Sequence, residues 1–242
     1  MKLDLLAFGA HPDDIELSCS GLLLAEKKNG KKVGVVDLTE GELGTRGTVE
    51  TRYLESAAAS LILGLDVREN LQLPDGFFMN DKESQLRVIK AIRKYQPEII
   101  VCNAPHDRHP DHGKAAELVT HAAFLSGLSK VETDINGTAQ MAWRPNYTFH
   151  YIQDRYIEPD FLIDITEVIE QKIASIRAYK TQFHNPSLQE PETYISQPEF
   201  LDNLLHQNQL LGKRIGVKYA EGFITKKILG FKNMDAFIKE NT

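Results

Sequence analysis

The segment Phe8-Gly9-Ala10-His11-Pro12-Asp13-Asp14-Ile15-Glu16 joins two different hydrophobic patterns. Residues 3–8 form a short apolar run that is typical of a buried strand, and residues 15–28 carry leucines at the spacing of a helix. The segment therefore lies on a strand-to-helix turn, which is where open α/β sheets place their sites. One imidazole and two carboxylates are costly to crowd there unless a cation or a substrate uses them. A structural alternative is that an aspartate caps the helix and the histidine is an ordinary loop residue.

A second cluster, His106-Asp107-Arg108-His109-Pro110-Asp111-His112, weakens that alternative. It too follows an apolar run, residues 98–102, and precedes a helical pattern, residues 110–125. Two such clusters are hard to explain as helix caps alone. Because the carboxyl ends of parallel strands meet at one edge of a sheet, we expect the two clusters to lie together.

The rest of the chain alternates strand and helix patterns, which predicts a three-layer α/β sandwich with a mostly parallel central sheet. Strands are expected at residues 3–8, 33–38, 70–73, 98–102, 147–152 and 161–165. Helices are expected at residues 15–28, 49–63, 83–95, 110–125, 166–182 and 199–212. We expect no regular structure in residues 126–145, a rim or lid in the proline-containing residues 183–198, and a mixed tail after residue 223.

Length and composition indicate one domain spanning residues 1–242, with a core in residues 1–127 and C-terminal strands, helices and rim in residues 128–242. The net charge of -6 and the lack of a basic stripe argue against a nucleic-acid partner. No apolar run is long enough to span a membrane, so we expect a cytoplasmic protein. Cys19 and Cys102 lie in core patterns, and no disulfide is expected. The oligomeric state stays open, a homo-oligomer included.

Residues 39–48 form a loop with three glycines and alternating charges at the edge where the two clusters are expected. We interpret it as a substrate loop in which Glu42 and Arg46 contact the substrate. Arg52 lies early in the following helix, and its planar guanidinium suits a carboxylate or a sugar hydroxyl. A solvated loop and a solvated arginine explain the same composition about equally well.

The two clusters supply the donors of a hydrolytic metal site, in which three protein ligands leave one position for water. We assign the ligands to His11, Asp14 and His112. Asp13 then faces the water as a general base, and His109 stabilises the oxyanion that forms. Asp111 is expected to orient the ring of His109 and keep it protonated, although an acid at a helix N-terminus is a comparable explanation.

These residues resemble the PIG-L/LmbE family of zinc-dependent de-N-acetylases, whose two signature blocks match residues 10–16 and 109–112. The loop 41–48, followed by Glu50, Arg52 and Glu55, is closer still to the bacillithiol-biosynthesis deacetylase branch. The resemblance implies a Rossmann-like fold, one Zn²⁺ per chain, and an N-acetylated amino sugar glycoside as the small-molecule partner.

The reaction that the resemblance implies is deacetylation of N-acetylglucosaminyl malate to glucosaminyl malate and acetate. Arg52 or Arg46 would suit the acidic malate. The roles implied for the two clusters agree with those assigned above, and for His184 and Tyr194 the resemblance suggests only a place on the rim.

Several alternatives stay open. A nucleotide-binding protein needs a glycine-rich first turn, and this turn offers one glycine followed by an imidazole and a proline. A metal-binding protein without activity has no use for a carboxylate beside an open metal position. Within the family, the alternative substrates are a chitooligosaccharide, another aminoglycoside or a thiol-sugar conjugate. Nitrogen and oxygen ligands also accept other divalent metals.

Overall fold

The structure, a computed structural model, describes residues 1–234, and its centre is a seven-stranded sheet. The strand order is β3-β2-β1-β4-β7-β9-β8. The first five strands pair in parallel, whereas β9 runs antiparallel to both of its neighbours. The strands are β1 Leu5–Gly9, β2 Val33–Thr39, β3 Val67–Leu73, β4 Ile99–Cys102, β7 Tyr147–Tyr151, β8 Phe161–Asp164 and β9 Ala220–Thr225.

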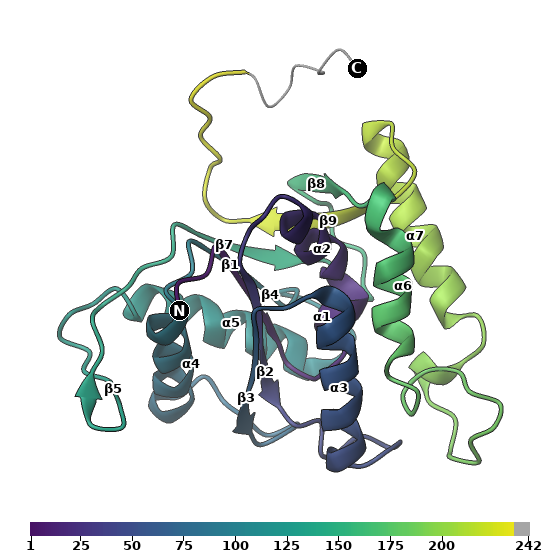
Figure 1. Ribbon diagram of the computed structural model, residues 1–242, viewed down its shortest axis with the longest axis horizontal. Coiled ribbons are helices and arrows are strands. Elements are labelled where there is room, and N and C mark those ends of the chain that lie inside the picture. The colour runs from purple at the N-terminus through teal and green to yellow at the C-terminus, as the bar shows by residue number, and fades with distance from the viewer. Residues whose placement is uncertain (235–242) are drawn as a thin grey trace.

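Helices cover both faces of this sheet (Figure 1). The helices are α1 Asp14–Ser18, α2 Ser20–Lys28, α3 Val49–Leu63, α4 Lys82–Tyr95, α5 Pro110–Leu125, α6 Ile169–Arg177 and α7 Phe200–Ile215. One core packs α4 and α5 onto the sheet, and another packs α1 and α2 onto its opposite face. The expected three-layer, mostly parallel α/β fold is confirmed.

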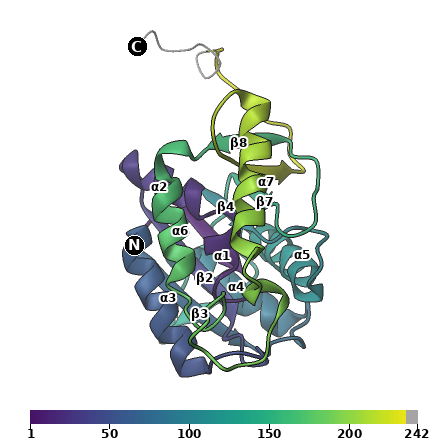
Figure 2. The same ribbon diagram turned by 90° about the vertical axis from the view of Figure 1, so that its right-hand side faces the viewer.

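The C-terminal half closes the sheet on one side. Helix α7 packs against β9 and lies beside α6, as the rotated view shows (Figure 2). Short 3₁₀ turns, η1 Thr166–Val168 and η2 Tyr194–Ser196, lead into α6 and α7. The turn η2 lies within residues 183–198, the segment that is expected from the sequence to form a rim or lid.

The expected helix 15–28 is instead two helices, which meet at Cys19. The break leaves free amides at the start of α2, and the Glu221 carboxylate accepts hydrogen bonds from two of them, Gly21 N (2.9 Å) and Leu22 N (2.8 Å). It also leaves carbonyls at the end of α1, and the Lys172 ammonium donates to those of residues 16 and 17. Lys172 Nζ lies 2.8 Å from Glu221 Oε1, so one buried ion pair caps both sides of the break.

Other differences from the expected elements are local. Residues 220–225, for which no strand was expected, form the buried strand β9, and residues 235–242 of the expected mixed tail lie outside the described residues. The region 126–145 contains a small hairpin, β5 Asp134–Ile135 and β6 Thr138–Ala139. The helix expected to reach residue 182 ends at Arg177. Strand β3 begins at Val67, three residues earlier than its apolar run suggested.

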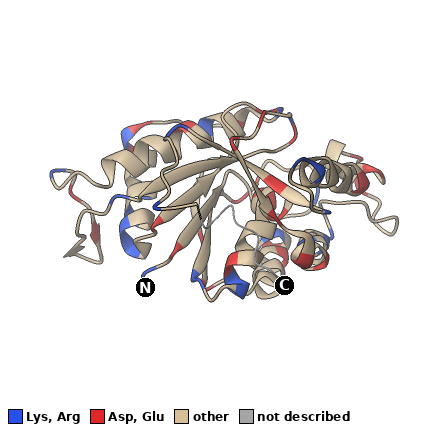
Figure 3. Cartoon of the chain, turned by 90° about the horizontal axis from the view of Figure 1, so that it is seen from above, with Lys and Arg blue, Asp and Glu red and all other residues tan. Residues whose placement is uncertain are grey.

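Charged residues of both signs are spread over the described part of the chain. Basic and acidic residues are interspersed along the cartoon of residues 1–234, with no extended basic band (Figure 3). Within residues 1–234, none of the helices has the length and apolar character needed to cross a lipid bilayer. Both cysteines are buried and free.

Candidate metal centre and catalytic cavity

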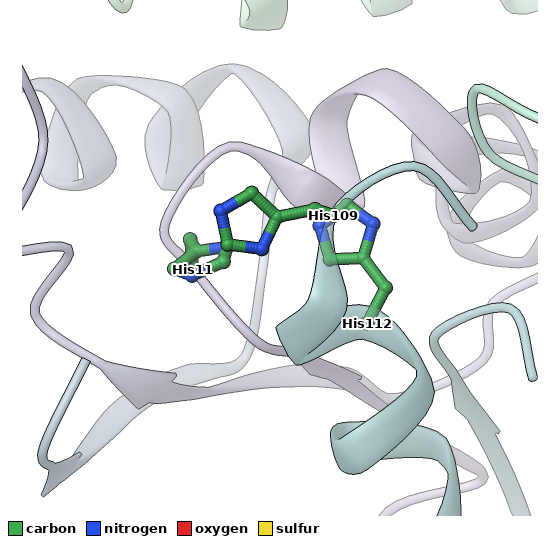
Figure 4. Close-up of side chains that lie close together, drawn as sticks. All are labelled: His11, His109 and His112. Atoms are coloured by element: carbon green, nitrogen blue, oxygen red, sulfur yellow. The ribbon is translucent and has the colours of Figure 1, made fainter. Parts of the chain in front are cut away.

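The two sequence clusters meet at the carboxyl edge of the sheet. Strands β1 and β4 are parallel neighbours, so the turns that follow them lie side by side. The rings of His11 and His112 have centroids 5.7 Å apart, and the ring of His109 lies 4.7 Å from the first and 5.1 Å from the second (Figure 4). The structure thus brings the expected histidines together.

The Asp14 carboxylate lies between two of these imidazoles. Its Oδ1 is 3.0 Å from His112 Nε2, and its Oδ2 is 3.6 Å from His11 Nδ1. Burial alone would raise the pKa of Asp14, but the neighbouring imidazoles outweigh burial and hold this pKa well below its usual range. The amide groups of Asn103 and Gln153 donate to the same carboxylate and fix its orientation.

Each imidazole has its other nitrogen held by a second carboxylate. Asp107 Oδ2 lies 2.5 Å from His112 Nδ1, and Asp75 Oδ1 lies 3.0 Å from His11 Nε2. A histidine that ligates a metal characteristically donates its remaining N–H to a carboxylate in this way. Imidazole nitrogens and carboxylate oxygens are donors that a divalent cation accepts. Among residues 1–234, the donor atoms that lie within 4.8 Å of one another belong to His11, His109 and His112, or to His11, Asp75 and Asp111, so Asp14 is in neither group. Ring nitrogens of all three histidines lie within 4.8 Å of one another, which makes His109 a further candidate ligand.

Asp107 gives a direct test of this donor set. Replacing Asp107 with Asn or Ala should weaken the affinity for a divalent metal ion about 10- to 100-fold, because the imidazole of His112 loses the carboxylate that orients it. Competition with a chromophoric chelator measures the affinity. Glu158→Gln removes an exposed carboxylate away from the cavity and should leave the affinity unchanged. An unaltered affinity in both Asp107 variants would separate Asp107 from metal binding.

Asp13 is buried beside this centre and has an unusual backbone. Its φ of 120° and ψ of -23° lie in a region that non-glycine residues rarely adopt, and such strain concentrates at functional positions. Burial raises the pKa of Asp13 to about 7, although the positive charge of Arg52 opposes the rise. A carboxyl group with a pKa near neutrality is suited to accept and release a proton.

His109 and Asp111 have neighbours that differ from those expected. The Asp111 carboxylate accepts hydrogen bonds from Gly76 N and Lys114 Nζ and lies 3.5 Å from His11 Nε2, so it supports His11 and not the ring of His109. The backbone N–H of Asp111 donates to His109 Nδ1, which leaves the proton of a neutral ring on Nε2. Burial and the charges of the other two histidines lower the pKa of His109.

The centre opens into a cavity of about 670 Å³. His11, Asp13, Asp14, His109 and His112 line it. Its walls come from the loops after β1, β2, β3, β4 and β7, and from the rim that includes η2 and the start of α7. The cavity therefore joins the histidine and aspartate turns of the N-terminal half to side chains of the C-terminal half.

The three expected substrate contacts occupy different positions. Arg52 lines the cavity, but its guanidinium is buried and donates to Pro12 O, Asp13 Oδ2 and Gln182 Oε1. Arg46 is buried 3.5 Å from Glu190 and Glu42 is exposed, and neither is among the lining residues. Glu42 instead accepts a hydrogen bond from Asp75 N, and so supports the turn that holds His11.

Sequence reasoning missed the residues that orient the centre, Asp75, Asn103, Asp107 and Gln153. Asp107 stands inside the second cluster, so its position carried a signal. Asp75 belongs to the segment Pro74-Asp75-Gly76, whose sequence is typical of a turn and carries no sign of a metal site. Nothing local distinguishes Asn103 or Gln153, which reach Asp14 from the ends of β4 and β7.

Comparison with known proteins gives several relatives. A conserved protein of known structure from Thermus thermophilus is 35% identical, with a TM-score of 0.84 over 95% of this chain and 98% of that one. Diacetylchitobiose deacetylase from Thermococcus kodakarensis is 26% identical over 90% of this chain and 80% of its own. A probable N-acetyl-α-D-glucosaminyl L-malate deacetylase 2 from Bacillus subtilis is also 26% identical, over 75% and 84%. A 4-oxalmesaconate hydratase from Pseudomonas putida is 27% identical over 74% of each chain.

The fold, the site, the deacetylases among these relatives and the matching family model together define the class of protein, a metal-dependent N-deacetylase that hydrolyses amide bonds. The family model described as PIG-L, GlcNAc-PI de-N-acetylase, matches residues 6–123, which hold both clusters. The chain belongs to this PIG-L family.

Proposed function

We propose that the protein removes the N-acetyl group from N-acetylglucosaminyl malate, giving glucosaminyl malate and acetate, as in bacillithiol biosynthesis. The observation that carries the proposal is the pair of imidazoles facing Asp14, each held from behind by a carboxylate, with the buried Asp13 beside them. The similarity to a glucosaminyl malate deacetylase supports the choice of substrate. The similarity to diacetylchitobiose deacetylase supports a chitooligosaccharide as the alternative.

We propose Zn²⁺ as the metal, held by His11, Asp14 and His112. A cation there supplies a Lewis acid that acidifies water and polarises the amide carbonyl. Asp13 accepts the proton of the attacking water at its carboxylate and passes it to the leaving amine. The Nε2–H of His109 donates a hydrogen bond to the oxygen that becomes negative during the attack. Arg52 holds Asp13 in place through its hydrogen bond and its charge.

Acetate release from purified protein tests the proposal. Protein stripped with a chelator and reloaded with zinc should release stoichiometric acetate from N-acetylglucosaminyl malate, and the stripped protein should release none. Diacetylchitobiose and 4-oxalmesaconate are the comparison substrates. Faster turnover of diacetylchitobiose than of N-acetylglucosaminyl malate would move the assignment to a chitooligosaccharide deacetylase. Hydration of 4-oxalmesaconate, with no acetate released from either sugar substrate, would overturn deacetylation altogether.

A further inference from the structure

The cavity wall holds a second arginine besides Arg52. Arg108 precedes His109 in the chain, and its side chain keeps 44% of its surface exposed. Its guanidinium carbon lies 4.3 Å from the centre of the Tyr194 ring. Its Nε lies 3.6 Å from Asp154 Oδ2, which is beyond hydrogen-bonding range. Arg108, Tyr194 and Asp154 all line the cavity.

The two arginines differ in what their donors do. Arg52 donates to a backbone carbonyl, a carboxylate and an amide oxygen, so its guanidinium is already engaged. Within residues 1–234, the guanidinium of Arg108 donates no hydrogen bond of normal length. A guanidinium offers five N–H donors in a planar fork that matches a carboxylate. Arg108 therefore keeps its fork available to a ligand in the cavity.

The neighbours of Arg108 fix its direction without occupying its fork. Tyr194 Oη donates to Asp154 Oδ1 at 2.6 Å, which ties the rim to the loop after β7. The aromatic ring covers one face of the guanidinium, and Asp154 stands at its Nε edge. The two terminal Nη groups remain, and they are the groups that grip a carboxylate in a bidentate contact.

We infer that Arg108 is the specificity-determining residue that binds a carboxylate on the aglycone of the substrate. The inference rests on the proposed function, because Arg108 lines the same cavity as His109 and the other histidines and would there meet a part of the substrate other than the reacting amide. It moves the anion-binding role from Arg52 and Arg46, the residues expected from sequence, to a residue whose donors are free. The ligand class is a sugar glycoside with a carboxylate-bearing aglycone.

The test compares N-acetylglucosaminyl malate with its dimethyl ester, which keeps the aglycone and masks both charges. Wild-type holoenzyme should prefer the free acid in kcat/KM by at least about tenfold, the contribution typical of a charged hydrogen bond. Arg108→Gln should abolish that preference by raising KM for the free acid, so that acid and ester are turned over with similar kcat/KM. Arg108→Lys should restore part of the preference, because it keeps the charge and loses the fork.

Arg144→Gln is the matched control. Arg144 also stacks on an aromatic ring, Phe124, at 4.3 Å, but it lies outside the cavity. The Arg144→Gln variant should keep the wild-type preference for the free acid over the ester. A wild type that does not discriminate acid from ester, or an Arg108→Gln variant that still does, overturns the inference.

If the proposed function is wrong, the wild-type protein should release no acetate from N-acetylglucosaminyl malate or from its dimethyl ester. Titration calorimetry of the holoenzyme with glucosaminyl malate and with methyl glucosaminide then decides the role of Arg108 without turnover. Weaker binding of the malate compound alone to Arg108→Gln would support the inference, and equal losses for both compounds would contradict it.

Discussion

Replacing Asp13 with Asn should lower kcat by about 10²- to 10⁴-fold while the metal content stays that of the wild type. The amide is isosteric and its oxygen still accepts a hydrogen bond from Arg52, so the buried guanidinium keeps a partner. What the variant loses is the ability to take a proton, for which a carboxyl group with a pKa near 7 is suited. Acetate release and metal analysis on the same preparation measure the two quantities.

Asp13→Ala and Asp13→Gly form a matched pair that separates proton transfer from backbone strain. Both lack the carboxylate and should be equally inactive. The backbone φ of 120° suits glycine and strains alanine, so Asp13→Gly should be the more stable variant by about 1 kcal/mol or more. Near-normal activity of Asp13→Asn would exclude Asp13 as the base, and loss of metal in all three variants would make it a ligand.

The placement of the site was predictable because it follows from topology. His11 lies in the turn after β1 and His112 lies in the first turn of α5 after β4, and two parallel neighbouring strands bring such turns together. The apolar runs and capping patterns also identify most helices. The bounds of α3 (Val49–Leu63) and α5 (Pro110–Leu125) are those expected for residues 49–63 and 110–125.

What sequence reasoning missed depends on distant partners. The apolar pattern of residues 15–28 continues through Cys19 without interruption, whereas the break there is stabilised by charges from α6 and β9. Residues 220–225 were not expected to form a strand, and the burial of Glu221 within them makes sense only with Lys172 opposite. Arg52 was likewise expected to contact the substrate, but its guanidinium donates hydrogen bonds to Asp13 and Gln182.

The buried pair at the helix break should be among the most sensitive points of the fold. Glu221→Ala should lower the free energy of unfolding by about 3–5 kcal/mol, because it leaves a fully buried ammonium without its counter-charge. It also leaves the amides of Gly21 and Leu22 without an acceptor. Lys172→Ala should have an effect of similar size, since it uncaps the carbonyls at the end of α1. Urea unfolding of the metal-loaded protein measures both.

The combined variant identifies the physical cause. If an uncompensated charge dominates the loss, the double variant Lys172→Met with Glu221→Leu should lose less free energy of unfolding than Lys172→Met and Glu221→Leu lose singly when summed, because both charges leave together. If the uncapped helix ends dominate, the losses should add, because neither leucine nor methionine satisfies the freed groups. Arg87→Ala removes an exposed ion pair with Glu83 on α4 and should change the unfolding midpoint little. A single change at Lys172 or Glu221 as mild as this control would mean that the break between α1 and α2 persists without its charged caps.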